Sequence, residues 1–240
     1  MAKVQLLPWF WGALGIAVLV AMLFVTPLTL IGWLAGVTYL LVSSLLVSLG
    51  LVRNRMTRLG PANAATATRS VLVGLITSLV VTSFERPIPV PLLIGLTVAA
   101  LLLDGVDGWL ARRFESESAL GARFDMEVDA FLMLVLSVFD ARALGWWIVA
   151  IGLMRYVFVA AGWVLPWLRA QLPPRYWRKV VTAVAGIALT LAATEFLSPL
   201  FGTIVLGVVL LLLIESFGRD VIWLFRRRRS YQANRVERIA

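Results

Sequence analysis

The sequence contains no cysteine and no histidine among its 240 residues, and each absence excludes a kind of chemistry. Without cysteine, the chain has no disulfide, no thiol nucleophile and no cysteine-bound zinc. Without histidine, it lacks the usual general base and the most common ligand of transition metals. Any proton transfer in this protein must therefore fall to a carboxylate.

Charged residues are also scarce, at 15% of the chain, whereas hydrophobic residues make up 61%. Soluble domains are nearer to half apolar and a quarter charged. The apolar runs are much longer than the strands of a membrane β-barrel, and they match the length of membrane-spanning helices. The composition therefore predicts an all-α integral membrane protein.

Eight apolar stretches are separated by short breaks rich in proline and charged residues, which are typical of helix boundaries. The first two predict an N-terminal hairpin, and the other six predict a helical core. We expect spans at 9–25, 28–52, 64–83, 90–111, 122–139, 143–165, 178–196 and 199–217. The expected domains are the hairpin with its basic loop (1–58), the six-helix core (59–220) and a basic tail (221–240).

The net charge of +9 could suggest a nucleic-acid partner, but the basic residues are spread over the breaks between the spans. If these breaks alternate between the two sides of a membrane, the breaks on one side contain only two basic residues, Arg86 and Arg142. The positive-inside rule places the other, basic side in the cytoplasm. We therefore expect a multi-pass protein of the cell membrane, with anionic lipids and not nucleic acid around its basic segments.

Four aspartates stand in two otherwise apolar segments that are joined by a polar turn. Asp104 and Asp107 are three residues apart and Asp125 and Asp129 four apart, so each pair points from one helix face. Antiparallel helices could bring both pairs together, where the carboxylates would repel unless cations neutralised them. Oxygen ligands favour Mg²⁺ or Mn²⁺. The stretch therefore predicts a site for two divalent cations, because an unpaired charge as deep in a span as Asp129 is costly.

Glycines and an arginine accompany the aspartates. Gly105, Gly108 and Gly121 each weaken a helix by about 1 kcal/mol relative to alanine. Their expected use is close approach of the backbone to a ligand. Arg112 follows the first aspartate pair by about one turn, and its guanidinium suits a donor phosphate.

These residues form one pattern, Asp104-x-x-Asp107-Gly108-x-x-Ala111-Arg112, eight residues, then Gly121-x-x-x-Asp125-x-x-x-Asp129. The pattern resembles the signature of the CDP-alcohol phosphotransferases (class I CDP-alcohol phosphatidyltransferases) at every fixed position. The resemblance implies that the aspartates hold two metal ions on the diphosphate of a CDP-linked donor. It also implies that Asp129 deprotonates the acceptor alcohol, and that the protein forms a homodimer.

Asn63, Thr66 and Arg69 recur at three-residue spacing on one side of the first core helix. From the residues alone they could equally be a helix cap and a positive-inside arginine. The resemblance implies that they line the nucleotide site. The residues expected to bind the donor are then Asn63, Thr66, Arg69, Gly105, Gly108, Ala111, Arg112 and Gly121.

Arg155 stands in the middle of a span, too deep to reach the interface easily, so we expect it to face inward with a functional role. Lys179 and Thr182 resemble the family's Gly-Lys-x-x-Thr pattern, with Arg178 in place of the glycine. We expect Arg155, Arg178 and Lys179 to bind the acceptor. Three basic side chains suit an acceptor that itself bears phosphate, such as glycerol phosphate, inositol phosphate or phosphatidylglycerol.

The predicted function is transfer of a phosphatidyl group from a CDP-alcohol to an alcohol, with release of CMP, in phospholipid biosynthesis. The expected CDP-alcohol is CDP-diacylglycerol. A divalent-cation transporter that uses the same carboxylates is the alternative. A transporter of this kind predicts paired broken helices in corresponding halves of the chain. The sequence shows no such symmetry, and transport leaves Gly108, Ala111 and Arg112 unexplained.

Overall fold

The computed structural model describes residues 2–54, 61–113, 119–170, 172–173, 175–194 and 196–237; side chains are described within 6–54, 64–106, 113, 120–170, 172–173, 175–194 and 196–227. Within these ranges every regular element is a helix, as predicted. The elements are α1 Ala2–Met22, α2 Leu30–Arg53, α3 Pro61–Thr82, α4 Val90–Arg113, α5 Ala119–Leu144, η1 Trp146–Ile148, α6 Val149–Val164, η2 Pro166–Arg169, α7 Tyr176–Ala193 and α8 Pro199–Glu237.

Four helical stretches of the described residues are long and apolar enough to cross a membrane. They are Leu30–Arg53, Ala64–Thr82, Trp146–Val164 and Pro199–Arg227, and Leu6–Met22 and Val90–Val106 are shorter apolar helices. The composition of the helices thus supports a multi-pass membrane protein. The arrangement of a two-helix hairpin followed by six core spans stays a prediction.

The last helix differs from the expectation in length. The last predicted span ended at residue 217, whereas α8 continues without a break to Glu237. No proline interrupts this stretch, and arginine is a good helix former. The charged residues that end an apolar span therefore do not end the helix.

The chain divides into two compact units, Met1–Phe139 and Asp140–Ala240, which are called here the first and the second unit. The division falls within α5, so this helix contributes to both. The predicted domains 1–58, 59–220 and 221–240 stay a prediction.

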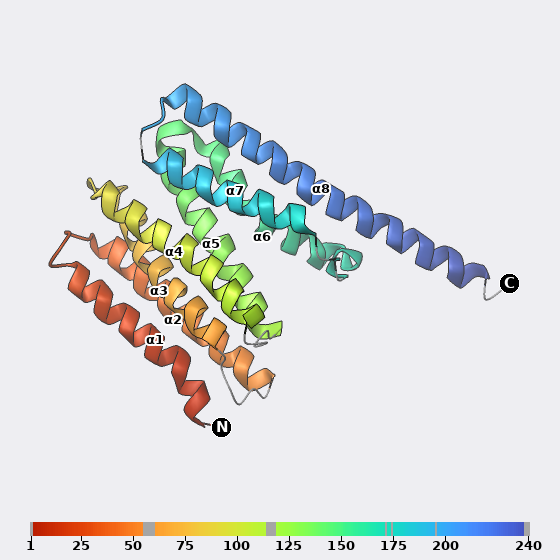
Figure 1. Ribbon diagram of the computed structural model, residues 1–240, viewed down its shortest axis with the longest axis horizontal. Coiled ribbons are helices and arrows are strands. Elements are labelled where there is room, and N and C mark those ends of the chain that lie inside the picture. The colour runs from red at the N-terminus through yellow and green to blue at the C-terminus, as the bar shows by residue number, and fades with distance from the viewer. Residues whose placement is uncertain are drawn as a thin grey trace. The chain divides into compact units, whose positions relative to one another are not determined.

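In the first unit, α3 is the central helix. It packs against α1, α2 and α4, which lie beside it in Figure 1. Two-thirds of its apolar stretch is buried, 67% of the window within Ala64–Thr82. Two of its buried hydroxyls are hydrogen-bonded to carbonyl groups: the Thr77 hydroxyl donates to Val73 within α3 (2.7 Å), and the Ser78 hydroxyl donates to Gly32 of α2 (2.7 Å). The polar residues of α3 therefore do not compete with its packing.

Glycines let α2 approach α3 closely. A Cβ added to Gly36 would lie 2.9 Å from the carbonyl oxygen of Gly74, and one added to Gly32 would lie 2.7 Å from that of Ser78. Both distances are too short for a side chain. Helices in membranes associate through small residues of this kind, because lipid supplies little hydrophobic force between them. The N-terminal hairpin is thus fixed to the central helix by backbone proximity.

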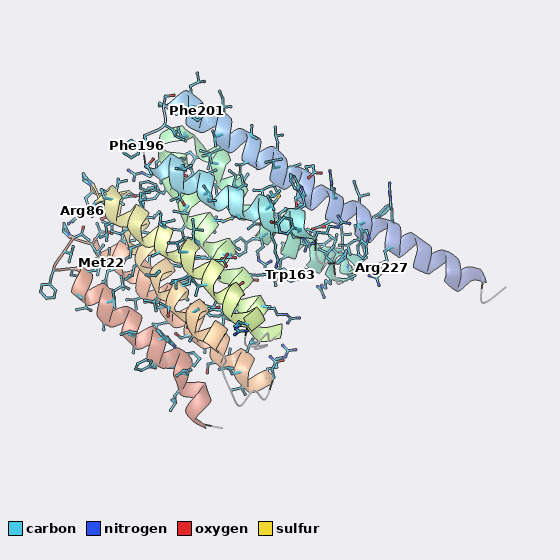
Figure 2. All side chains as sticks on the ribbon, in the orientation of Figure 1. Met22, Arg86, Trp163, Phe196, Phe201 and Arg227 are labelled. Atoms are coloured by element: carbon cyan, nitrogen blue, oxygen red, sulfur yellow. The ribbon has the colours of Figure 1, made fainter. Side chains whose placement is uncertain are left out.

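The second unit is built from α6, α7 and α8 with the short η1 and η2. Gly145, with φ of 112°, makes the sharp turn from α5 into η1 in a backbone region that favours glycine. Aromatic rings join the helices: Phe158 and Phe217 have centroids 5.6 Å apart, and Trp167 and Phe225 5.8 Å. In Figure 2, Phe196 and Phe201 mark the end where α7 meets α8, and Trp163 and Arg227 lie toward the other end of this unit.

The buried face of α8 follows the spacing of three and four residues that is expected for a helix packed on one side. This face begins with apolar residues and becomes polar in the second half of the helix. It consists of Leu206, Val209, Leu213, Ser216, Asp220 and Leu224.

Candidate active site

Three of the four predicted aspartates come together in the first unit. Asp104 is on α4, and Asp125 and Asp129 lie one turn apart on the following helix α5. One carboxylate oxygen of each residue lies within 4.8 Å of the other two. Their side chains are 45%, 34% and 31% exposed, respectively. We call these three residues the carboxylate cluster.

Arg69, from the central helix α3, is the counter-charge of the carboxylate cluster. Its Nη1 donates to Asp104 Oδ1 and its Nη2 to Asp125 Oδ1, and Nη2 lies 3.2 Å from Asp129 Oδ1. The same Nη2 is 3.4 Å from the main-chain carbonyl of Asp125. The Arg69 side chain is fully buried, at 0% exposure. A guanidinium this deep needs paired carboxylates, because burying an isolated charge costs several kcal/mol.

The charge balance of the cluster leaves room for cations. One guanidinium against three ionised carboxylates gives a formal charge of −2 for the group of four side chains. The donor set consists of oxygen atoms, which are the ligands that Mg²⁺ and Mn²⁺ prefer. The carboxylates are partly exposed, so their outer edges can be reached from solvent. The residues present therefore fit divalent cations.

The fourth predicted aspartate, Asp107, lies on α4 one turn after Asp104, but its side chain is outside the described residues. The same is true of four of the predicted donor-binding residues, Asn63, Gly108, Ala111 and Arg112. Their predicted roles stay predictions.

The other predicted donor-binding residues stand on α3, α4 and α5, the three helices that also carry Arg69 and the cluster. Thr66 is buried on α3, about one turn before Arg69. Beside Gly105 there is space, because a Cβ at this position would meet no described atom within 4 Å. Gly121, near the start of α5, borders a small cavity of about 50 Å³ that is shared with α1, α2 and α3. Space next to two of the three predicted glycines is compatible with a ligand near the backbone.

The hairpin reaches the site through hydroxyl and aromatic contacts that the sequence did not predict. Ser70, next to Arg69, has its Oγ 2.9 Å from Ser43 Oγ and donates to the Tyr39 hydroxyl at 3.3 Å. The Tyr39 ring stacks on Phe131 of α5, with centroids 4.6 Å apart. Helix α2 therefore contacts both α3 and α5 beside the cluster. The signal in the sequence for this contact of α2 with α3 and α5 was a tyrosine, Tyr39, in an apolar run.

The predicted acceptor residues all lie in the second unit. Arg155 is half-buried on α6, and Lys179 is exposed in the first turn of α7. Arg178 has its Nε 3.1 Å from Asp220 Oδ2 and donates through Nη2 to the Pro173 carbonyl at 3.1 Å. Asp220, whose side chain is 5% exposed, was missed by the sequence reasoning. An acidic residue in an otherwise apolar and basic stretch was the available signal.

Among known proteins, no curated protein and no solved structure matches the chain. The model of one protein family, described as CDP-alcohol phosphatidyltransferase, matches residues 59–214. The match covers more than half of the chain, and it includes the whole aspartate pattern, Arg69 and the helices that bring them together. The chain therefore belongs to the CDP-alcohol phosphatidyltransferase family.

Proposed function

We propose that this protein transfers the phosphatidyl group of CDP-diacylglycerol to an alcohol and releases CMP, as a step of phospholipid biosynthesis. Family membership supports the general reaction, transfer of a phosphatidyl group from a CDP-alcohol. The observation that carries the proposal is the carboxylate cluster around Arg69, inside the matched range. The long apolar helices support a donor that is itself a membrane lipid.

Two divalent cations, Mg²⁺ or Mn²⁺, would be held by Asp104, Asp107, Asp125 and Asp129. When bound, they would neutralise the negative charge that develops on the diphosphate of the donor. The chain itself contributes three of these carboxylates held together in advance by Arg69. Preorganised charges of this kind cost little reorganisation during the reaction.

Asp129 is the proposed general base. It accepts the proton of the acceptor hydroxyl, whose oxygen then bonds to the phosphorus that bears diacylglycerol. The bond from this phosphorus to the bridging oxygen breaks, and CMP leaves with the electron pair. Asp129 suits this role because the chain has no histidine. Its side chain is 31% exposed, so an acceptor hydroxyl can approach it.

The donor would be bound by residues of α3, α4 and the start of α5. Thr66 and Arg69 lie about one turn apart on α3, and the space beside Gly105 opens on α4. Arg69 can hydrogen-bond phosphate oxygens through the same Nη atoms that hold the carboxylates. The proposed donor-binding set is Asn63, Thr66, Arg69, Gly105, Gly108, Ala111, Arg112 and Gly121.

The acceptor in this proposal bears phosphate. Arg155, Arg178 and Lys179 supply three positive charges, which would be of little use to a neutral or cationic alcohol. Glycerol phosphate, inositol phosphate and phosphatidylglycerol all meet the requirement. We place the reaction at the cytoplasmic face of the cell membrane, in a homodimer, on the distribution of basic residues and the family resemblance.

The test is a panel of acceptors offered to the purified protein with CDP-diacylglycerol and Mg²⁺. The expected result is CMP release in step with one new phospholipid, identified by mass spectrometry, from a phosphate-bearing acceptor. Arg86→Gln, which removes an exposed arginine between α3 and α4, is the control and should keep wild-type turnover. A protein that releases no CMP with any CDP-alcohol, yet moves Mn²⁺ into proteoliposomes, would instead be a transporter.

A further inference from the structure

The N-terminal hairpin, α1 and α2, lies outside residues 59–214, where the chain matches the family, and the reaction as proposed gives it no role. Within the first unit, α2 contacts both α3, which carries Arg69, and α5, which carries Asp125 and Asp129. The hairpin is therefore placed to act on the carboxylate cluster through the helices that bear it.

One face of α5 contacts the hairpin. Leu120, Phe124 and Phe131 follow each other at intervals of four and seven residues, so they project from the same side of the helix. Leu120 meets α2 at Gly50, where an added Cβ would lie 2.5 Å from Leu120 Cδ1. Phe124 lines the cavity of about 50 Å³ that α5 shares with α1, α2 and α3. Phe131 stacks on Tyr39, with ring centroids 4.6 Å apart and ring planes inclined by 18°. The contacts thus extend over about three turns of α5.

The aspartates stand on the neighbouring face of the same helix. Asp125 follows Phe124 directly, and Asp129 precedes Phe131 by two residues. Successive residues of an α-helix are about 100° apart around its axis. A rotation of α5 that broke the ring stack would therefore also swing both carboxylates. The rotation of α5 decides where they lie relative to Asp104.

Tyr39 is itself attached to the central helix. The Ser70 hydroxyl donates to the Tyr39 oxygen at 3.3 Å, and Ser70 Oγ lies 2.9 Å from Ser43 Oγ, one turn further along α2. Ser70 is the neighbour of Arg69, whose Nη atoms hold two of the carboxylates. Tyr39 thus joins the helix that supplies the counter-charge to the helix that supplies two of the three aspartates.

We propose that Tyr39 is a positioning residue, which stacks on Phe131, fixes the rotation of α5 and so holds Asp125 and Asp129 within reach of the cations that Asp104 also binds. Residues behind metal ligands commonly fix the orientation of those ligands, and replacing them weakens metal binding by about 10- to 100-fold. The hairpin then preorganises a cation site whose ligands all belong to the matched residues. This inference rests on the proposed function in one respect, that the cluster binds divalent cations.

The test compares the Mn²⁺ affinity of variants of the full chain in nanodiscs, with free Mn²⁺ measured by electron paramagnetic resonance and no donor present. We expect Tyr39→Leu, which removes the ring, to raise the Kd for Mn²⁺ by about tenfold. Tyr39→Phe keeps the ring, and Ser70 keeps Ser43 as a partner, so its Kd should stay near the wild-type value. The control is Phe10→Leu, an aromatic-to-leucine change at a position of α1 that is 61% exposed, and its Kd should equal that of the wild type.

Phe131→Leu tests the same contact from α5. It should raise the Kd by a similar factor, and combining it with Tyr39→Leu should raise the Kd little further, because both changes remove one contact. Excess Mn²⁺ should restore CMP release by Tyr39→Leu, since the defect lies in cation affinity. Thermal unfolding in EDTA shows which variants are folded, and if Tyr39→Leu is not, Phe131→Leu and Tyr39→Phe decide the question.

A wild-type Kd for Mn²⁺ in Tyr39→Leu, or an equal loss of affinity in Tyr39→Phe or Phe10→Leu, would overturn the inference. Full additivity of the two losses in the double variant would do the same. Failure of the proposed function has a different signature: the wild type then binds Mn²⁺ and Tyr39→Leu binds it more weakly, yet neither releases CMP from any CDP-alcohol.

Discussion

Replacing Arg69 by glutamine would take a fully buried guanidinium away from three carboxylates. Removing one partner of a fully buried ion pair costs about 3–5 kcal/mol. The carboxylates here are 31–45% exposed, so water screens part of their repulsion. We therefore expect the free energy of unfolding to fall by about 2–3 kcal/mol in EDTA. For a chain of this size that corresponds to a drop of about 4–12 °C in the unfolding temperature.

Divalent cations should reverse much of this loss, because they bring positive charge to the same oxygens. A cation at a hundred times its Kd stabilises the folded state by about 2.7 kcal/mol. The assay is thermal unfolding of purified protein, with Mg²⁺ or with EDTA, for the wild type, Arg69→Gln and the control Arg86→Gln. We expect Mg²⁺ to raise the unfolding temperature of Arg69→Gln more than that of the wild type, in which Arg69 already neutralises one of the three negative charges. An unchanged unfolding temperature of Arg69→Gln in EDTA would refute the assignment of Arg69 as the counter-charge.

Three further predictions concern the reaction and the packing. Asp129→Asn should lower turnover by about 10²-fold or more, with CDP-alcohol binding almost unchanged. Asp107→Asn should instead weaken the binding of cations and of the donor. Near-normal turnover of Asp129→Asn would show that another residue is the general base. Arg155→Ala and Lys179→Ala should each raise the acceptor KM by at least about tenfold, which corresponds to the loss of one charge-assisted contact. The KM for CDP-diacylglycerol should change little. A preference of the wild type for serine or ethanolamine over every phosphorylated alcohol would exclude a phosphate-bearing acceptor. Gly36→Val should destabilise the protein by about 1–3 kcal/mol, because the Cβ of the valine would clash with the Gly74 carbonyl. An unfolding temperature equal to that of the wild type would show that α2 can shift away from α3 at no cost.

The sequence predicted the helices well because long apolar runs and proline-rich breaks are local signals. It also predicted that Asp125 and Asp129 share one face and that Asp104 comes close to them, since helical spacing and a short connection determine this. The end of α8 was not predicted. Hydropathy indicates where a membrane span ends, but the helix continues through the basic residues to Glu237.

The ion pairs could not be predicted, because they depend on which helices pack together. Arg69 was expected to bind the donor, and no sequence pattern indicates that it pairs with aspartates 35 and 56 residues further along the chain. Asp220 is a similar case, since its contact with Arg178 spans 42 residues. Both pairs join residues on different helices, and periodicity within one helix contains no information about such contacts.

The central claim is that this carboxylate cluster performs cation-dependent transfer from a CDP-alcohol. The most direct measurement is CMP release from CDP-diacylglycerol by the purified protein with its acceptor, first in Mg²⁺, then in excess EDTA, and again after Mg²⁺ is restored. We predict that CMP release stops in EDTA, returns with Mg²⁺ or Mn²⁺, and is absent in Asp104→Asn and Asp125→Asn under all three conditions. Undiminished CMP release in excess EDTA, or from both aspartate variants, would contradict the account.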